Sequence, residues 1–165
     1  MNKDFRELLS AFNEHKVKYL IVSGYAVSYH SEPRTTKDLD LFIQSSPENA
    51  KAVFQALADF GAPLDGVSVE DFTNPEIIFQ MGVPPQRIDL LQKIEGVDFE
   101  TAWDRRVRGP ILAGDPFEAE YISARDLIQN KRAVGRPRDL LDVDDIQAAL
   151  KATGQPLPHS NEFDR

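Results

Sequence analysis

Residues 19–44 constrain the fold more than any other segment of the chain. Tyr19 to Val22 is a β-rich apolar run that ends at Ser23-Gly24, where the backbone can turn tightly. Ala26 to His30 predicts a short helix, and residues 39–44 predict a second strand. A strand, a glycine turn, a helix and a strand in this order predict a compact α/β unit.

The other segments are expected to complete an α+β (α/β) fold, a mixed sheet flanked by helices. Apolar spacing and capping residues predict further helices over residues 4–15, 47–60, 98–103 and 139–152, and one that opens at residue 123. β-rich runs predict strands over residues 76–81, 87–91 and 117–122, the first two as a hairpin, whereas residues 62–75 carry no clear pattern. We expect a single domain over residues 1–154, followed by a disordered tail over residues 155–165.

Composition excludes several classes of site. The chain has no cysteine, so neither a disulfide framework nor a thiolate zinc site can form. A net charge of −8, from 27 acidic and 19 basic residues, argues against broad charge-driven binding to nucleic acid or membranes, but leaves room for a local basic patch. There is no run of about 18 apolar residues and no signal-peptide pattern at the start, so we expect a cytoplasmic protein without membrane contact.

Asp38-Leu39-Asp40 is the sharpest chemical feature. Side chains alternate across a strand, so carboxylates two residues apart project from the same face. Two adjacent carboxylates repel each other unless a cation lies between them, and Mg²⁺ prefers such oxygen ligands beside substrate phosphates. Taken alone, the motif favours an acidic strand edge in solvent over a metal site.

The context of this motif resembles the DNA polymerase β-like nucleotidyltransferases. An apolar strand, the Ser23-Gly24 pair, thirteen residues and then Asp38-Leu39-Asp40-Leu41-Phe42 follow the signature of that superfamily, with Ser where the family usually has Gly. The resemblance implies a palm-like nucleotidyltransferase fold. It also implies that the small-residue turn starts a helix whose backbone N–H groups approach a nucleoside triphosphate.

A third carboxylate is expected from Asp89, which lies in the otherwise apolar run Arg87-Ile88-Asp89-Leu90-Leu91. The alternative role of Asp89 is to pair with an arginine such as Arg87 or Arg34. Joined to the resemblance, the three aspartates imply two divalent ions, Mg²⁺ or Mn²⁺. Asp38 and Asp40 would bind metal together with the triphosphate, and Asp89 would complete the metal site and act as a base.

Basic residues on either side of the aspartates extend the resemblance. Arg34 and Thr36 form an R-x-T-x-D lead into Asp38, and they are expected to order the loop or to contact phosphate. Lys131 and Arg138 fall in a K…R-x-[KR]-D-x-x-D pattern similar to that of short bacterial nucleotidyltransferase-fold proteins of the abortive-infection toxin type. The resemblance implies that Lys131 contacts a nucleotide phosphate. A surface arginine beside a turn and a solvated helix face are the alternatives.

The implied activity is the transfer of a nucleoside monophosphate from an NTP to a hydroxyl of a tRNA, a protein or a small molecule. One alternative is a toxin–antitoxin or defence component that binds a cognate protein partner and retains weak catalysis. A second is an aminoglycoside-type antibiotic nucleotidyltransferase, although such enzymes usually carry an additional helical domain. The preferred NTP, the acceptor and the oligomeric state are not readable from the residues.

Overall fold

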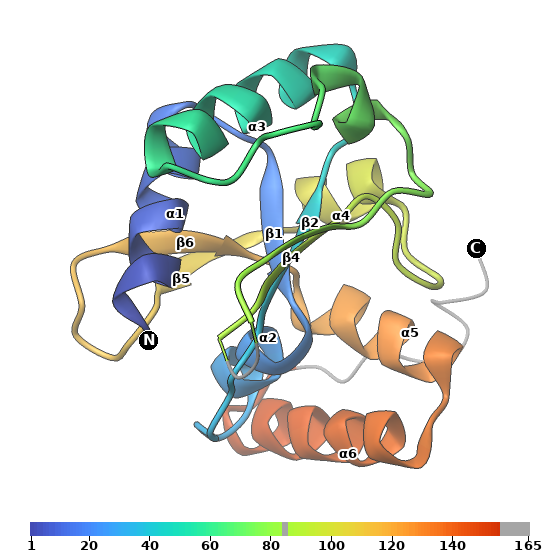
Figure 1. The fold of residues 1–165 in the computed structure, drawn as a ribbon. Coiled ribbons are helices and arrows are strands. Elements are labelled where there is room, and N and C mark those ends of the chain that lie inside the picture. The colour runs from blue at the N-terminus through green and yellow to red at the C-terminus, as the bar shows by residue number, and fades with distance from the viewer. Residues whose placement is uncertain (84–85, 156–165) are drawn as a thin grey trace.

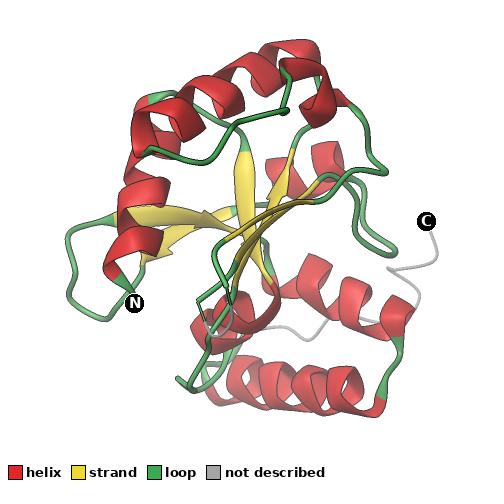
Figure 2. Ribbon diagram, viewed as in Figure 1, coloured by secondary structure: helices red, strands yellow, loops and turns green. Residues whose placement is uncertain are grey.

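The computed structural model of the chain describes residues 1–83 and 86–155, and shows a six-stranded sheet flanked by helices (Figures 1 and 2). The strands are β1 (Tyr19–Val22), β2 (Leu39–Ile43), β3 (Phe79–Met81), β4 (Ile88–Leu91), β5 (Val107–Pro110) and β6 (Glu118–Tyr121). The helices are α1 (Lys3–Glu14), α2 (Ser23–His30), α3 (Pro47–Phe60), α4 (Phe99–Asp104), α5 (Ala124–Val134) and α6 (Pro137–Ala152), with a short 3-10 helix η1 (Val69–Thr73).

The sheet is mixed, with the strand order β3-β4-β2-β1-β6-β5. β1 runs antiparallel to β2 and parallel to β6, β2 runs parallel to β4, and β3 and β5 pair antiparallel to β4 and β6 at the two edges. The register aligns Val22, Asp40 and Asp89 across the three adjacent strands β1, β2 and β4. The expected fold class is therefore confirmed, and the sheet itself brings the second and third aspartates side by side.

Five of the six α-helices form two groups around this sheet. α1 packs against α3, while α5 packs against α6 and α2, and Figure 1 shows these two groups at opposite ends of the molecule. α1 buries four apolar side chains at helical spacing: Phe5, Leu8, Leu9 and Phe12. Each fully buried side chain of this size contributes about 1.5–3 kcal/mol, so this one face accounts for a large part of the docking energy of α1.

Capping residues set the helix ends much as the sequence indicates. Ser46 accepts a hydrogen bond from the Asn49 backbone N–H at the start of α3, and Gly61 ends that helix with φ of 90°. Asp98 and Ser123 cap α4 and α5 in the same way. Because these signals are local, they locate the helices without knowledge of the tertiary structure.

Three parts of the architecture differ from the sequence-based expectation. α2 begins at Ser23 and not at Ala26, because the chain enters the helix directly from β1 without an intervening turn. The prediction lacked β5, a short edge strand whose Val-Arg-Gly-Pro sequence is atypical of strands. η1 occupies part of the segment that carried no pattern.

Two expectations involve residues outside the described ranges. β3 and β4 pair as the predicted hairpin, although the first strand is shorter, and residues 84–85 of the connecting segment lie outside the described ranges. The expected tail falls outside the described residues from position 156 onward. Within residues 1–83 and 86–155, the helices are all too short or too polar to cross a bilayer.

Candidate active site

A cavity of about 630 Å³ opens where α2, the segment leading into β2, α5 and α6 meet. Eight of the nine site residues predicted from the sequence line it: Ser23, Gly24, Arg34, Thr36, Asp38, Asp40, Lys131 and Arg138. The residues come from two segments, 23–40 and 131–138, that are 91 positions apart at their nearest ends, so the fold brings together what the sequence shows only as separate motifs. Asp89, the ninth, does not line the cavity.

The start of α2 supplies free backbone donors to this cavity. Ser23 has φ of 57°, a left-handed conformation that a non-glycine residue adopts only when its surroundings enforce it. No side chain caps the first turn of α2, so its first N–H groups are left for another acceptor. At Gly24, an added Cβ would lie 2.7 Å from the Thr36 Cγ2 atom, so any larger residue would force the Thr36 side chain or the helix start to shift.

Asp38 and Asp40 both face this cavity from the beginning of β2. Burial raises the pKa of Asp40, a hydrogen bond from Ser23 opposes that rise, and the negative charges of Asp89 and Asp38 raise it further. The Asp38 Oδ1 atom accepts a hydrogen bond of 3.3 Å from the Arg87 backbone N–H. A buried carboxylate whose pKa is raised by neighbouring negative charges is the arrangement that a bound cation stabilises.

Asp89 is buried, with 8% of its surface exposed, and it pairs with Arg87. The Arg87 Nε and Asp89 Oδ1 atoms are 3.0 Å apart, but their geometry is not that of a hydrogen bond, and both atoms are buried without a hydrogen-bond partner. The arginine pairing considered as the alternative for Asp89 is therefore present. A buried carboxylate oxygen without a donor also fits a site for a cation.

The chemistry of the aspartates fits a divalent metal, although the described residues hold no group of three or more carboxylate or histidine side chains already arranged as a metal centre. Asp38 and Asp40 share one cavity wall, and Asp89 lies beside Asp40 in the sheet register. Arg87 is the cation that now contacts this set. A metal bound here would therefore take its remaining ligands from a substrate or from solvent.

Lys131 is the centre of an ion network between α5 and α6. Its Nζ atom lies 3.0 Å from an oxygen of Asp142 and 3.3 Å from an oxygen of Asp139, and only 8% of the residue is exposed. Arg34 binds Asp142 at 2.7 Å, which ties the loop before β2 to α6. Lys131 thus lines the cavity, with its charge already balanced by two buried carboxylates.

The pKa values of the two carboxylates in this network move in the opposite direction from that of Asp40. A hydrogen bond from Arg136 lowers the pKa of Asp139 to about 2, against the effect of burial, with further help from Lys131. Burial alone would raise the pKa of Asp142, but hydrogen bonds from Arg34 and Lys131 outweigh it and lower that pKa. Both carboxylates are therefore held in the ionised form.

Two exposed cations at the cavity wall have no ion-pair partner among the described residues, Lys37 and Arg138. Arg138 was among the predicted site residues, whereas Lys37 was not. The position of Lys37 directly before Asp38 is the signal that could have indicated this residue. Arg136 also lines the cavity and was not predicted. The signal that could have indicated it is Asp139, its ion-pair partner, which follows three residues later at the start of α6.

Comparison with known proteins places the fold. By sequence, the chain matches no protein-family profile and no curated protein. Among solved structures, it is similar to the lincosamide antibiotic adenylyltransferase LnuA in its lincomycin-bound crystal structure. The TM-score is 0.50 at 15% sequence identity, and the match covers 90% of this chain and 98% of that chain. At this identity the similarity establishes the fold alone, a mixed sheet flanked by helices that a nucleotidyltransferase also has.

Proposed function

We propose that this chain is a metal-dependent nucleotidyltransferase that moves a nucleoside monophosphate from an NTP to a hydroxyl acceptor. The observation that carries the proposal is the composition of one cavity wall. Asp38 and Asp40 lie there beside the uncapped start of α2 and the unpaired cations Lys37 and Arg138. Carboxylates for a metal, together with N–H groups and cations for phosphate, suit a metal-bound triphosphate.

Asp38 and Asp40 would hold Mg²⁺ or Mn²⁺, with Asp89 as the neighbouring carboxylate in the register. A bound divalent ion would neutralise negative charge on the triphosphate and stabilise the leaving pyrophosphate. The N–H groups of Ser23 and Gly24 would bind phosphate oxygens at the helix start, and Arg138 would contact the same group from α6. Lys131, through its network, would fix α5 and α6 against the cavity.

The proposed reaction exchanges a phosphoanhydride bond of the NTP for a phosphoester bond to the acceptor. The acceptor hydroxyl oxygen attacks the α-phosphorus of the NTP and forms a new P–O bond. The bond between the α-phosphorus and the oxygen that bridges to the β-phosphate breaks, and pyrophosphate leaves with the electron pair. The hydroxyl proton passes to the Oδ1 atom of Asp89, which has no hydrogen bond. This transfer requires that Arg87 first moves away and no longer neutralises the carboxylate.

The structural neighbour favours an antibiotic as one acceptor class, beside a tRNA or a protein. The match covers nearly the whole of the neighbour, so an antibiotic adenylyltransferase does not require the additional helical domain that such enzymes usually carry. A toxin–antitoxin role remains the alternative, and exposed Leu140 and Leu141 on α6 are where a cognate protein partner would bind. The cytoplasmic location is part of the same proposal, because an NTP-dependent enzyme needs the cellular nucleotide pool.

Calorimetric titration of each NTP, with and without Mg²⁺, tests the proposal. The wild type should bind at least one NTP saturably and only with Mg²⁺. Asp40→Asn should lose this binding, whereas Asp144→Asn, the same change at an exposed position of α6 outside the cavity, should retain it. Metal-dependent binding that survives in Asp40→Asn, or its absence from a folded wild type, would refute the proposal.

An isotope experiment then identifies the reaction. Label in the α-phosphate should move to the acceptor, and label in the γ-phosphate should leave with pyrophosphate. Transfer of the γ-label to the acceptor would instead show a kinase. Candidate acceptors begin with lincomycin and bulk tRNA, so the same gel and chromatographic readouts separate the antibiotic class from the nucleic-acid class.

A further inference from the structure

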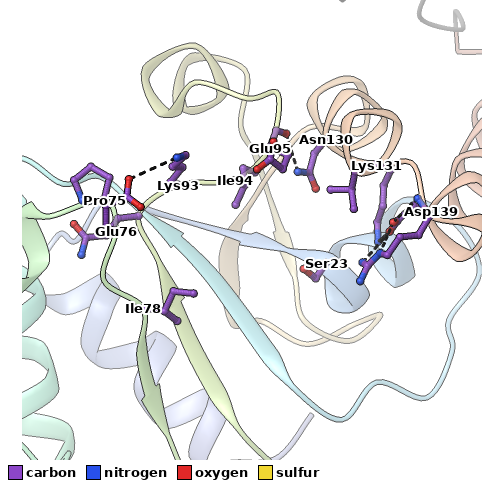
Figure 3. A pocket seen from close by; sticks show the side chains of 13 residues that line it. Ser23, Pro75, Glu76, Ile78, Lys93, Ile94, Glu95, Asn130, Lys131 and Asp139 are labelled. Carbon is purple, nitrogen blue, oxygen red and sulfur yellow. Dashed lines mark hydrogen bonds and ion pairs between the residues drawn. The ribbon is translucent and has the colours of Figure 1, made fainter.

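A second hollow, of about 350 Å³, adjoins the cavity on the side of β3 and β4 (Figure 3). The two spaces share four residues: Ser23, Lys131, Arg136 and Asp139. Figure 3 shows Ile78 and the Glu76–Lys93 pair on the sheet side, with Asn130 and Lys131 opposite them on α5. A molecule in the hollow would therefore meet the contents of the cavity at Ser23 and Lys131.

The two spaces are lined by different parts of the fold. The cavity is lined by the start of α2, the segment before β2, α5 and α6, whereas the hollow is lined by the segments before β3 and after β4, by α5 and by the start of α6. Asp40 lines the cavity, and Asp89, its neighbour in the sheet register, lies on β4, whose following segment lines the hollow. Two substrates that occupy the two spaces would meet at the shared residues Ser23 and Lys131, and a transfer reaction requires such a contact.

The lining of the hollow differs in chemistry from that of the cavity. Ile78 is 55% exposed and Val134 is 38% exposed, so apolar surface faces solvent on both walls. The Glu95 carboxylate has no ion-pair partner among the described residues, and Lys93 is already paired with Glu76. The hollow thus offers apolar contact and one uncompensated negative charge.

Gln92 adds a polar group that is buried within the lining. Only 7% of this residue is exposed, and its side-chain nitrogen donates to the Asp71 carbonyl at 2.8 Å. Its Oε1 atom has no hydrogen-bond partner. A buried acceptor without a donor costs about 1–3 kcal/mol. Because the Oε1 atom is itself buried, a ligand in the hollow would contact it only after neighbouring side chains shift.

We propose that the hollow binds the acceptor, and that the acceptor is a small amine-bearing alcohol with an apolar face. This inference rests on the proposed transferase function. The volume lies within the range of about 300–1,000 Å³ typical of small-molecule sites. Ile78 and Val134 take the apolar face, and Glu95 takes the ammonium group. A tRNA would need unpaired cations here, and this wall offers an unpaired carboxylate.

Side-chain and backbone NMR signals of the protein provide the test, with three matched probes. Phenylalaninol carries an apolar ring, an amine and a hydroxyl; N-acetylphenylalaninol lacks the charge; and ethanolamine lacks the apolar face. Phenylalaninol should shift the signals of Ile78 and Gln92 at millimolar concentration, and the other two probes should bind more weakly. Equal shifts with all three probes, or no shift in the hollow, would overturn the assignment.

The variant Glu95→Gln separates charge recognition from shape. It should weaken the binding of phenylalaninol by about two- to fivefold, as expected for an exposed ion pair, and leave the binding of N-acetylphenylalaninol unchanged. Glu118→Gln, which removes an exposed carboxylate on the distant strand β6, should change the binding of neither probe. An equal loss for both probes in Glu95→Gln would contradict the proposed ammonium contact.

The nucleotide provides the last discriminating measurement. Mg-ATP should shift the signals of Gly24 and Lys37 and leave those of Ile78 and Gln92 in place. Shifts of Ile78 and Gln92 by ATP would assign the hollow to the nucleoside and overturn the acceptor proposal. Absence of any ATP binding, with phenylalaninol still bound in the hollow, would refute the transferase function while leaving a binding site for amino alcohols.

Discussion

Two groups of carboxylates border the same cavity, and their charge balance differs. The strand site has three carboxylates, Asp38, Asp40 and Asp89, and one contacting cation, Arg87. The helix network has two carboxylates, Asp139 and Asp142, and three cations, Lys131, Arg34 and Arg136. One group has surplus negative charge, and the other is fully compensated.

The pKa shifts follow this balance. The pKa of Asp40 is raised by burial and by the neighbouring aspartates, so its charged form costs free energy in the folded protein. The pKa of Asp139 is lowered to about 2 by its cationic partners, so its charged form stabilises the fold. The difference indicates that the helix network holds the structure, whereas the strand site is left in a state that a bound cation would stabilise.

The largest effect is expected at the centre of the helix network. Lys131→Met leaves the buried carboxylates of Asp139 and Asp142 without their shared cation, which should lower the free energy of unfolding by about 3 kcal/mol. Urea unfolding followed by the fluorescence of Trp103 measures this. Lys151→Met, the same change at an exposed position of α6, should cost less than about 0.5 kcal/mol. Equal losses for the two variants would show that the network does not stabilise the fold.

Replacing an aspartate by asparagine should change the free energy of unfolding in opposite directions in the two groups. Asp142→Asn removes the charge that binds Arg34 and Lys131, and should cost about 2 kcal/mol. Asp40→Asn removes a repelled charge, and should stabilise the metal-free protein by about 1 kcal/mol while abolishing Mg-NTP binding. The same urea titration at neutral pH measures both. A loss of stability in Asp40→Asn would mean that its charge is compensated after all.

The sequence predicted the strand site better than the helix network for a physical reason. The shared face of Asp38 and Asp40 follows from strand alternation, and the start of α2 follows from the Ser23-Gly24 pair, so local geometry suffices. The Arg34–Asp142 pair joins residues 108 positions apart. Its existence depends on how α6 packs against α2, which no local pattern determines.

The same limit applied to Asp89 and to the edge of the sheet. Residue patterns left open whether Asp89 binds a metal or an arginine, and only the structure shows that Arg87 contacts it. β5 was not predicted because Gly109 is there for a tertiary reason, since any Cβ at this position would clash with the Tyr29 hydroxyl. A residue that is required by a distant contact, such as Gly109, lowers the strand propensity of its own segment, so the local sequence pattern no longer indicates a strand.

A smaller effect is expected from acid. The lowered pKa of Asp139 gives stability that is fully present above the ordinary aspartate value of 3.8 and is lost as the pH falls toward about 2. Arg136 is well exposed, so we discount this contribution for solvent screening to about 1 kcal/mol. Urea unfolding between about pH 5 and about pH 3 should therefore show a steeper loss in the wild type than in Asp139→Asn. Parallel curves would argue against a depressed pKa at this position.

The smallest effect is expected at Arg87, the one cation of the strand site. Arg87→Met should lower the free energy of unfolding by about 0.5 kcal/mol without metal, because the three carboxylates then repel one another with no cation between them. Mg²⁺ should recover the lost stability. It should also raise the unfolding midpoint of the variant more than that of the wild type, because in the variant Mg²⁺ does not compete with the Arg87 guanidinium. Arg87→Lys keeps the charge and should respond as the wild type does. If Mg²⁺ stabilised none of the three proteins, the surplus charge of the strand site would not be a metal site, and its distinction from the helix network would lose its functional meaning.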